Sequence, residues 1–117
     1  MIDSKDLGEV GEFDIRAYLV PDDELTPTTN GVYTDDVIAA WKRGEWHYVT
    51  VVVTASRDGV ELGSASLGGC EYGDFPGDPE RVNPLNGSGG AFCNGYGPGL
   101  IKEAVEAAGE TLSRISR

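Results

Sequence analysis

The stretch 46–56, Trp-His-Tyr-Val-Thr-Val-Val-Val-Thr-Ala-Ser, constrains the fold most, because most of its residues are β-branched or aromatic and favour extended backbone. Arg57 follows, and then the pair Asp58-Gly59, which suits the two positive φ angles of a type I′ turn. The sequence therefore predicts that residues 46–56 form the central strand of a sheet. Residues 60–72 are predicted to return beside it as an antiparallel strand.

The two faces of this central strand differ in polarity, since side chains alternate along a strand. The face that we assign to the core carries Val49, Val51, Val53 and Ala55. The other face, which we expect to be partly exposed, carries Trp46, Tyr48, Thr50, Val52 and Thr54.

Three further elements follow from periodicity and end signals. Residues 13–20 alternate apolar and polar side chains, as a half-buried strand does, and Pro21 ends the run. A helix of about ten residues is predicted after the cap residue Thr34, with Trp41 packing it on the sheet and Gly44 in the left-handed position that follows it. A last helix is predicted over residues 98–115, where apolar side chains form one stripe.

The chain of 117 residues is expected to form one domain over residues 1–117. Residues 1–12 are polar and predict a turn-rich, flexible lead-in, and residues 73–97 predict a long Gly/Pro-rich loop. The order strand, helix, strand, strand, helix predicts an α+β fold. We expect a three-stranded antiparallel sheet with both helices packed on one face.

The sequence shows no sign of a membrane or export signal. No apolar run approaches the ~20 residues of a transmembrane helix, and the first residues lack the basic and apolar regions of a signal peptide. We therefore expect the protein in the cytoplasm, where Cys70 and Cys93 stay reduced.

Acidity is the most informative property of the composition. The chain has 20 acidic and 9 basic residues, a net charge of −11, and residues 1–36 alone hold ten acidic against two basic residues, a net −8. Direct binding to nucleic acid is disfavoured, because phosphate contacts require a basic surface. A partner with a basic surface is favoured instead.

The residues that usually carry catalysis or bind cofactors occur in no recognisable motif, so we expect neither an enzyme nor a cofactor. His47 is the single histidine, and no serine or cysteine lies in a nucleophile motif. The glycine-rich residues 87–90 and 95–99 lack the Gly-Lys-Ser/Thr ending of a phosphate-binding loop. The acidic residues between 71 and 80 do not have the spacing of a calcium loop, and prolines interrupt them.

Two tryptophans, Trp41 and Trp46, bracket the junction between the first helix and the central strand. Buried tryptophan commonly joins helix to strand, so core packing is the favoured interpretation. An exposed Trp46 would instead mark a binding surface.

The segment 36–76 contains Ile-Ala-Ala-Trp-Lys-Arg-Gly-Glu-Trp at 38–46, the Val-Val-Val run, Glu-Leu-Gly-Ser-Ala-Ser-Leu at 61–67 and Glu-Tyr-Gly-Asp-Phe-Pro at 71–76. With these residues it resembles small acidic proteins carried by bacteriophages and other mobile elements of bacteria. The resemblance implies an inhibitor of the anti-CRISPR or antirestriction kind, many of which mimic DNA. It implies no reaction.

Charge and resemblance together predict an acidic inhibitor that occupies the basic surface of a host nucleic-acid-binding defence complex. We expect the partner-binding carboxylates to form one continuous patch on a stiff sheet. The predicted partner-binding residues are Asp22, Asp23, Glu24, Asp35, Asp36, Glu71, Asp74, Asp78, Glu80 and Trp46. The alternative is a non-enzymatic module that binds another protein or a small ligand through the aromatic strand face and the 73–97 loop.

Overall fold

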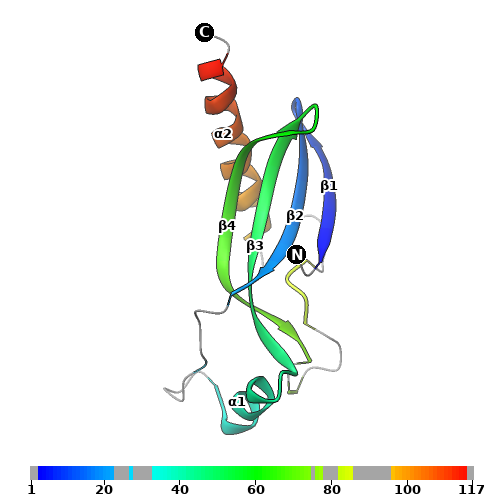
Figure 1. Cartoon of the computed structure of the whole chain (residues 1–117), viewed down its shortest axis with the longest axis vertical. Coiled ribbons are helices and arrows are strands. Elements are labelled where there is room, and N and C mark those ends of the chain that lie inside the picture. Colours follow the sequence, from blue (N-terminus) through cyan, green and yellow to red (C-terminus); the bar gives the residue numbers. More distant parts are fainter. Residues whose placement is uncertain are drawn as a thin grey trace.

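A computed structural model of the chain describes residues 3–22, 27, 33–74, 76–77, 82–85 and 96–115. Its elements are β1 (Ser4–Val10), β2 (Phe13–Pro21), α1 (Asp35–Lys42), β3 (Trp46–Arg57), β4 (Val60–Gly73) and α2 (Gly97–Ile115). The four strands form one antiparallel sheet in the order β1-β2-β3-β4 (Figure 1). The α+β class with two helices and an antiparallel sheet is confirmed, whereas the three-stranded sheet and the predicted element order are wrong.

The additional strand is β1, which occupies the region predicted to be a flexible lead-in. Val10 pairs with Phe13 across the two-residue turn Gly11-Glu12, and Gly11 has φ 60°, the positive angle that a type II′ turn needs at its first position. The strand is hard to recognise in the sequence because a register shift between Asp6 and Gly8 interrupts its alternation. Leu7, at this bulge, packs against the core.

The central hairpin forms as predicted. Asp58 has φ 54° and Gly59 has φ 80°, so both residues of the two-residue turn adopt the positive angles of a type I′ turn. Strand β4 pairs with β3 along its whole length, with register shifts between Val49 and Val51 and between Ala55 and Ser56.

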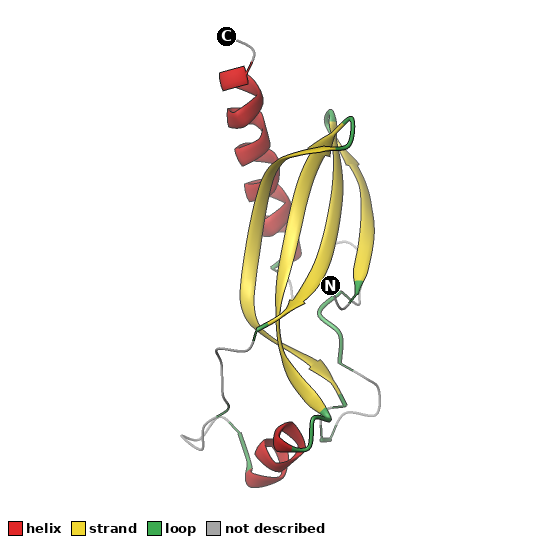
Figure 2. Ribbon diagram, in the orientation of Figure 1, coloured by secondary structure: helices red, strands yellow, loops and turns green. Residues whose placement is uncertain are grey.

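The larger core lies between α2 and the inner face of the sheet, and Figure 2 shows this helix lying against the sheet. The predicted inward residues of β2 and β3 are all buried there: Phe13, Ile15, Ala17, Leu19, Val49, Val51, Val53 and Ala55. Helix α2 buries Leu100, Ala104 and Ala108, whereas Ile115, predicted as part of its apolar stripe, is exposed. Gly63 lets the helix approach, because a Cβ there would lie within 2.9 Å of the backbone of α2.

Helix α1 lies beyond one end of the sheet and builds a second, smaller core with Trp46 and Tyr48 (Figure 1). These two residues lie on the face of β3 opposite to the one that α2 covers, so the prediction that both helices share one face is wrong. Gly44 has φ 77° and follows the helix as predicted, but the side chain of Thr34 makes no capping hydrogen bond.

The predicted 73–97 loop lies largely outside the described residues. In its described part, Leu85 is buried in the core, whereas Tyr96 is exposed. Phe75, Phe92 and Cys93 lie outside the described residues.

Candidate functional site

The face of the sheet that α2 does not cover is open and polar. Alternation along β2 turns Asp14 and Arg16 to this face, while Ile15 between them is buried in the core. The pairing of β2 with β3 places Ser56 opposite Asp14 and Thr54 opposite Arg16. Because β1 also pairs Asp6 with Arg16, three consecutive strands bring charged and hydroxyl side chains together on one surface.

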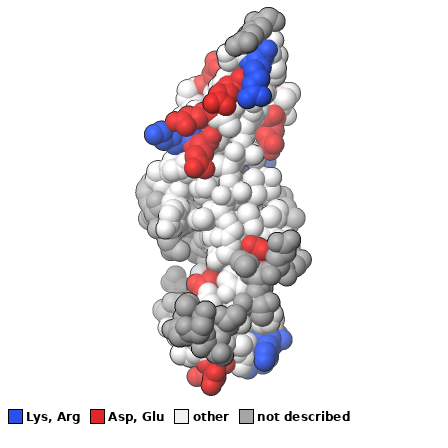
Figure 3. Space-filling view, turned by 90° about the vertical axis from the view of Figure 1, so that its left-hand side faces the viewer, with Lys and Arg blue, Asp and Glu red and all other residues white. Residues whose placement is uncertain are grey.

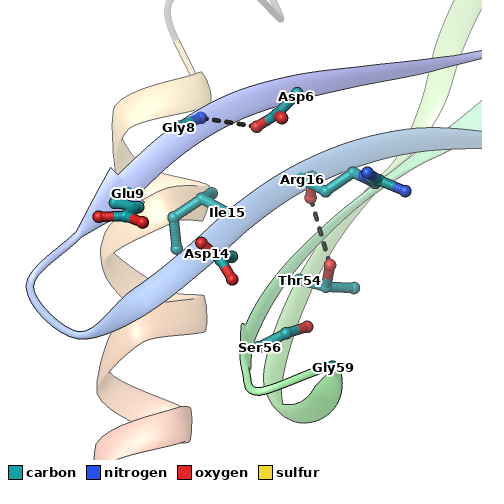
Figure 4. Close-up of a pocket in the computed structure, with 9 residues that line it drawn as sticks. All are labelled: Asp6, Gly8, Glu9, Asp14, Ile15, Arg16, Thr54, Ser56 and Gly59. Atoms are coloured by element: carbon teal, nitrogen blue, oxygen red, sulfur yellow. Dashed lines mark hydrogen bonds between the residues drawn. The ribbon is translucent and has the colours of Figure 1, made fainter.

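This surface is hollowed where the β1–β2 hairpin and the β3–β4 hairpin end, as Figure 4 shows. We call the hollow the acidic notch; its volume is about 690 Å³. Its lining residues are Asp6, Gly8, Glu9, Asp14, Ile15, Arg16, Thr54, Ser56 and Gly59. The small residues Ser56 and Gly59 lie on the side of the β3–β4 hairpin, so no long side chain of that hairpin fills the space.

Two of the lining residues make hydrogen bonds to the backbone, one within β1 and one between β3 and β2. The backbone N–H of Gly8 donates to Oδ1 of Asp6 at 2.9 Å, which fixes this carboxylate at the bulge of β1. The hydroxyl of Thr54, only 7% exposed, donates to the carbonyl oxygen of Arg16 at 3.5 Å.

The charge of the acidic notch is uneven. Three carboxylates, those of Asp6, Glu9 and Asp14, line it against the single guanidinium of Arg16. Within the described part of the chain, none of the four forms an ion pair within 4 Å. In Figure 4 the guanidinium of Arg16 points away from Asp14. The carboxylates thus face solvent unneutralised, which is the state that attracts a cationic partner.

The side chains that line the notch are suited to contacts with cationic groups. Among the residues that the structure describes, no three His, Cys, Asp or Glu side chains are grouped closely enough to hold a metal ion. Lysine and arginine side chains are the groups that isolated carboxylates and hydroxyls recognise through charge-assisted hydrogen bonds.

The predicted partner-binding carboxylates that the structure describes lie outside the notch, toward the α1 end of the molecule. Asp22 has a structural contact: its Oδ2 accepts from the hydroxyl of Thr50 at 3.3 Å and from the N–H of Gly69 at 3.2 Å. Glu71 is half-buried and approaches Tyr33 and Tyr48.

Three further predicted carboxylates are exposed. Asp35 and Asp36 begin α1, and Asp74 follows β4. The cationic Arg43 lies close to Asp36 and forms an ion pair with Glu45. Asp23, Glu24, Asp78 and Glu80 lie outside the described residues.

Four of the nine predicted carboxylates lie outside the described residues, so one continuous patch of all nine stays a prediction. In Figure 3, carboxylates gather toward both ends of the visible face, and the side chains between them are mostly uncharged. The reason is the length of the molecule, which places α1 and the hairpin turns at opposite ends (Figure 1).

Trp46 is not at the surface. Its side chain is 0% exposed, its Nε1–H donates to the carbonyl oxygen of Val37 at 2.8 Å, and its ring contacts that of Tyr48 edge to face at 5.2 Å. Core packing, the favoured interpretation of the sequence, is therefore the role that the structure gives it. It presents no surface to a partner, and the aromatic strand face invoked for the alternative function is covered at this end.

Burial and neighbouring charge perturb Tyr33, in the second core, and Cys70, which packs against the larger core. Burial raises the pKa of the Tyr33 phenol, and hydrogen bonds with Tyr48 and Glu71 raise it further. The pKa of the free Cys70 thiol is raised by burial first and then by the carboxylates of Asp22 and Glu71. Cys70 is therefore a poor nucleophile, since the thiolate is the reactive form.

Sequence reasoning missed the residues of the acidic notch because it treated residues 1–12 as a lead-in. The signal that was present is the polar alternation of β2, whose outward positions include Asp14 and Arg16. The positions of Asp6 and Glu9 depend on the pairing of β1 with β2.

No protein-family model, curated protein or solved structure matches this chain. In the part of the chain that the structure describes, neither helix is long and apolar enough to cross a membrane.

Proposed function

We propose that this protein is an acidic inhibitor, of phage or mobile-element origin, that binds and blocks a nucleic-acid-binding defence complex of a bacterial host. It acts in the cytoplasm by occupancy, in the manner of DNA-mimicking anti-CRISPR and antirestriction proteins, and catalyses no reaction. The observation that supports this best is the acidic notch, a concave surface on a rigid sheet whose carboxylates are not neutralised.

Charge around the notch favours a basic partner over a small neutral ligand. Its lining carries three carboxylates and one guanidinium, a net −2. The neighbouring ion pair of Arg57 with Glu12, at 3.6 Å, adds no net charge, while Asp58 and Glu61 beside it are exposed. Such a surface speeds association with a basic groove and repels nucleic acid itself.

The dimensions of the molecule suit a groove built for a duplex. Its extents are 56 × 26 × 23 Å and its radius of gyration is 16.3 Å, against the ~13 Å expected of a compact chain of this length. A duplex as long as the molecule has about 16 base pairs and about 33 phosphate charges, whereas the protein has a net charge of −11. The protein therefore imitates the charge of only part of such a duplex.

The decisive experiment is competition with DNA. A type I restriction enzyme and a Cas surveillance complex are each titrated with the protein at low and at high salt, and DNA binding and cleavage are measured. We expect binding that excludes DNA and weakens steeply with salt.

A matched pair of variants locates the contact. Glu9→Gln with Asp14→Asn removes two charges from the notch, and Glu103→Gln with Glu106→Gln removes two from the exposed face of α2. We expect the notch variant to bind about tenfold more weakly, or ~1.4 kcal/mol, and the α2 variant to bind within about twofold of the wild type. Inhibition that persists at high salt, or equal losses in both variants, would contradict the proposal.

A further inference from the structure

The outer edge of β4 has no charged side chain along its middle, although the protein as a whole is acidic. Its nine residues 62–70, Leu-Gly-Ser-Ala-Ser-Leu-Gly-Gly-Cys, include no charged side chain. Within the described residues, β4 pairs on this edge only through one bridge, between Gly73 and Val82. Figure 3, viewed from the β4 side of the molecule, shows mostly uncharged atoms at mid-height.

Edge strands expose unpaired N–H and C=O groups and are usually protected by charges, proline or bulges. The opposite edge of the sheet is protected in this way, because β1 carries Asp6, Glu9 and the inward Lys5, whose Nζ donates to the carbonyl oxygen of Leu85 at 3.0 Å. The edge of β4 has only bulges, and the register shifts place them around Leu62 and around Gly68 and Gly69. The five residues between them, 63–67, keep a regular register with β3.

From this edge we infer that β4 pairs with β4 of a second copy of the chain. The two strands run antiparallel, and a two-fold axis at Ala65 relates the two copies. The axis passes through the midpoint of the regular segment, so Gly63 of one copy lies opposite Leu67 of the other and Ser64 opposite Ser66. These pairings keep the two faces in register, because Ser64 and Ser66 are exposed while Ala65 and Leu67 are half-buried toward the core.

The distribution of charge determines where two copies can approach one another and which register they adopt. Two copies that each carry a net −11 repel one another over most of their surfaces, so an uncharged edge is where they can approach closely. With the axis at Ala65, Glu61 lies opposite Gly69, whose N–H is hydrogen-bonded to the carboxylate of Asp22. With the axis one residue later, at Ser66, Glu61 would lie directly opposite Glu71 twice, which is destabilising.

The resulting assembly is a continuous eight-stranded sheet with C2 symmetry. An axis perpendicular to the sheet keeps both α2 helices on one face and both acidic notches on the other. The inference does not depend on the proposed function, since it rests on β4 rather than on the carboxylates. If the dimer forms and the proposed function is also correct, a partner contacts two acidic notches on one surface of the dimer.

A charge-reversal pair tests the register directly. In Ser64→Glu with Ser66→Glu, the dimer would bring two introduced carboxylates face to face at each of two symmetric positions. In Ser64→Glu with Ser66→Lys, the same positions would form two facing pairs of opposite charge. Both serines are exposed in the single chain, so both variants are expected to fold, and circular dichroism verifies this.

Sedimentation equilibrium and light scattering over a range of concentrations measure the oligomeric state. We expect the wild type to pass from one chain to two as concentration rises. We expect the Glu/Glu variant to need at least about tenfold more protein, and the Glu/Lys variant to recover wild-type dimerisation. A wild type that remains monomeric at high micromolar concentration overturns the inference, as does a dimer that both variants leave unchanged.

Discussion

Gly63 is the point where α2 lies closest to the sheet, and Gly63→Ala tests how firmly these two layers are packed. The added Cβ would lie 2.9 Å from the carbonyl carbon of Ala107 and closer still to the backbone of Ala104 and Ala108. Ordinary contact between such atoms begins at about 3.5 Å, so the helix must move outward by about 1 Å. The neighbours are backbone atoms and cannot rotate away as a flexible side chain would.

The expected loss in the free energy of unfolding follows from the side chains that α2 buries. Leu100, Ala104 and Ala108 are the buried side chains of the helix, and their burial stabilises the fold by about 5 kcal/mol at ~0.8 kcal/mol per CH₂ group. A gap of 0.5–1 Å forfeits roughly a quarter to a half of such contacts, and overpacking adds ~1–3 kcal/mol of strain. The lower entropy of alanine in the unfolded chain offsets up to about 1 kcal/mol. We expect a net loss of about 2–3 kcal/mol.

Urea denaturation followed by circular dichroism measures this loss. Gly109→Ala is the control, because Gly109 is exposed in α2, has no neighbour within 4 Å and has an ordinary φ. It should stabilise the protein by about 0.5–1 kcal/mol through helix propensity. If Gly63→Ala unfolds within about 0.5 kcal/mol of the wild type, the close packing argued here is wrong.

Two further predictions concern Trp46 in the second core and the stability of the protein at alkaline pH. Trp46→Phe removes the 2.8 Å hydrogen bond to the carbonyl of Val37 and should lower the free energy of unfolding by about 2 kcal/mol. Trp41→Phe, at a half-buried position, should lower it by less. Equal losses of the two variants in urea denaturation would contradict this prediction. Stability should also fall as pH rises above the ordinary values of 9.0 for the Cys70 thiol and 10.0 for the Tyr33 phenol, because both groups hold their protons in the folded state while the unfolded chain releases them. Tyr33→Phe should flatten the alkaline part of a pH series of urea melts, and an unchanged slope would show that this phenol is not responsible.

Sequence reasoning worked best where one short stretch carried the whole signal. The turn at Asp58-Gly59, the left-handed Gly44 and the buried face of β3 are all local consequences of residue type, and each is confirmed. The failures involve partners far apart in the chain. Strand β1 has no clear alternation of its own and is defined by its pairing with β2. Helix α1 is amphipathic, but its sequence does not say which face of β3 it meets.

The residues of the candidate site also divide into those that local sequence predicts and those that depend on strand pairing. Outward positions of β2 such as Asp14 and Arg16 follow from alternation, whereas their neighbours Asp6, Thr54 and Ser56 depend on register across three strands. Asp22 illustrates the opposite case. Its charge made it a candidate for binding a partner, and the fold uses its carboxylate to hold the β4 bulge at Gly69.

By itself, the sequence determined the acidity of this protein, its central hairpin and the apolar faces that build its larger core, because these properties depend on residues that are neighbours in the chain. Tertiary structure alone decided which carboxylates share a surface, that Trp46 is buried under α1, and that an uncharged strand lies at the edge of the sheet. The physical reason is that strand pairing joins residues far apart in the chain, and a shift of one residue would turn each side chain to the other face.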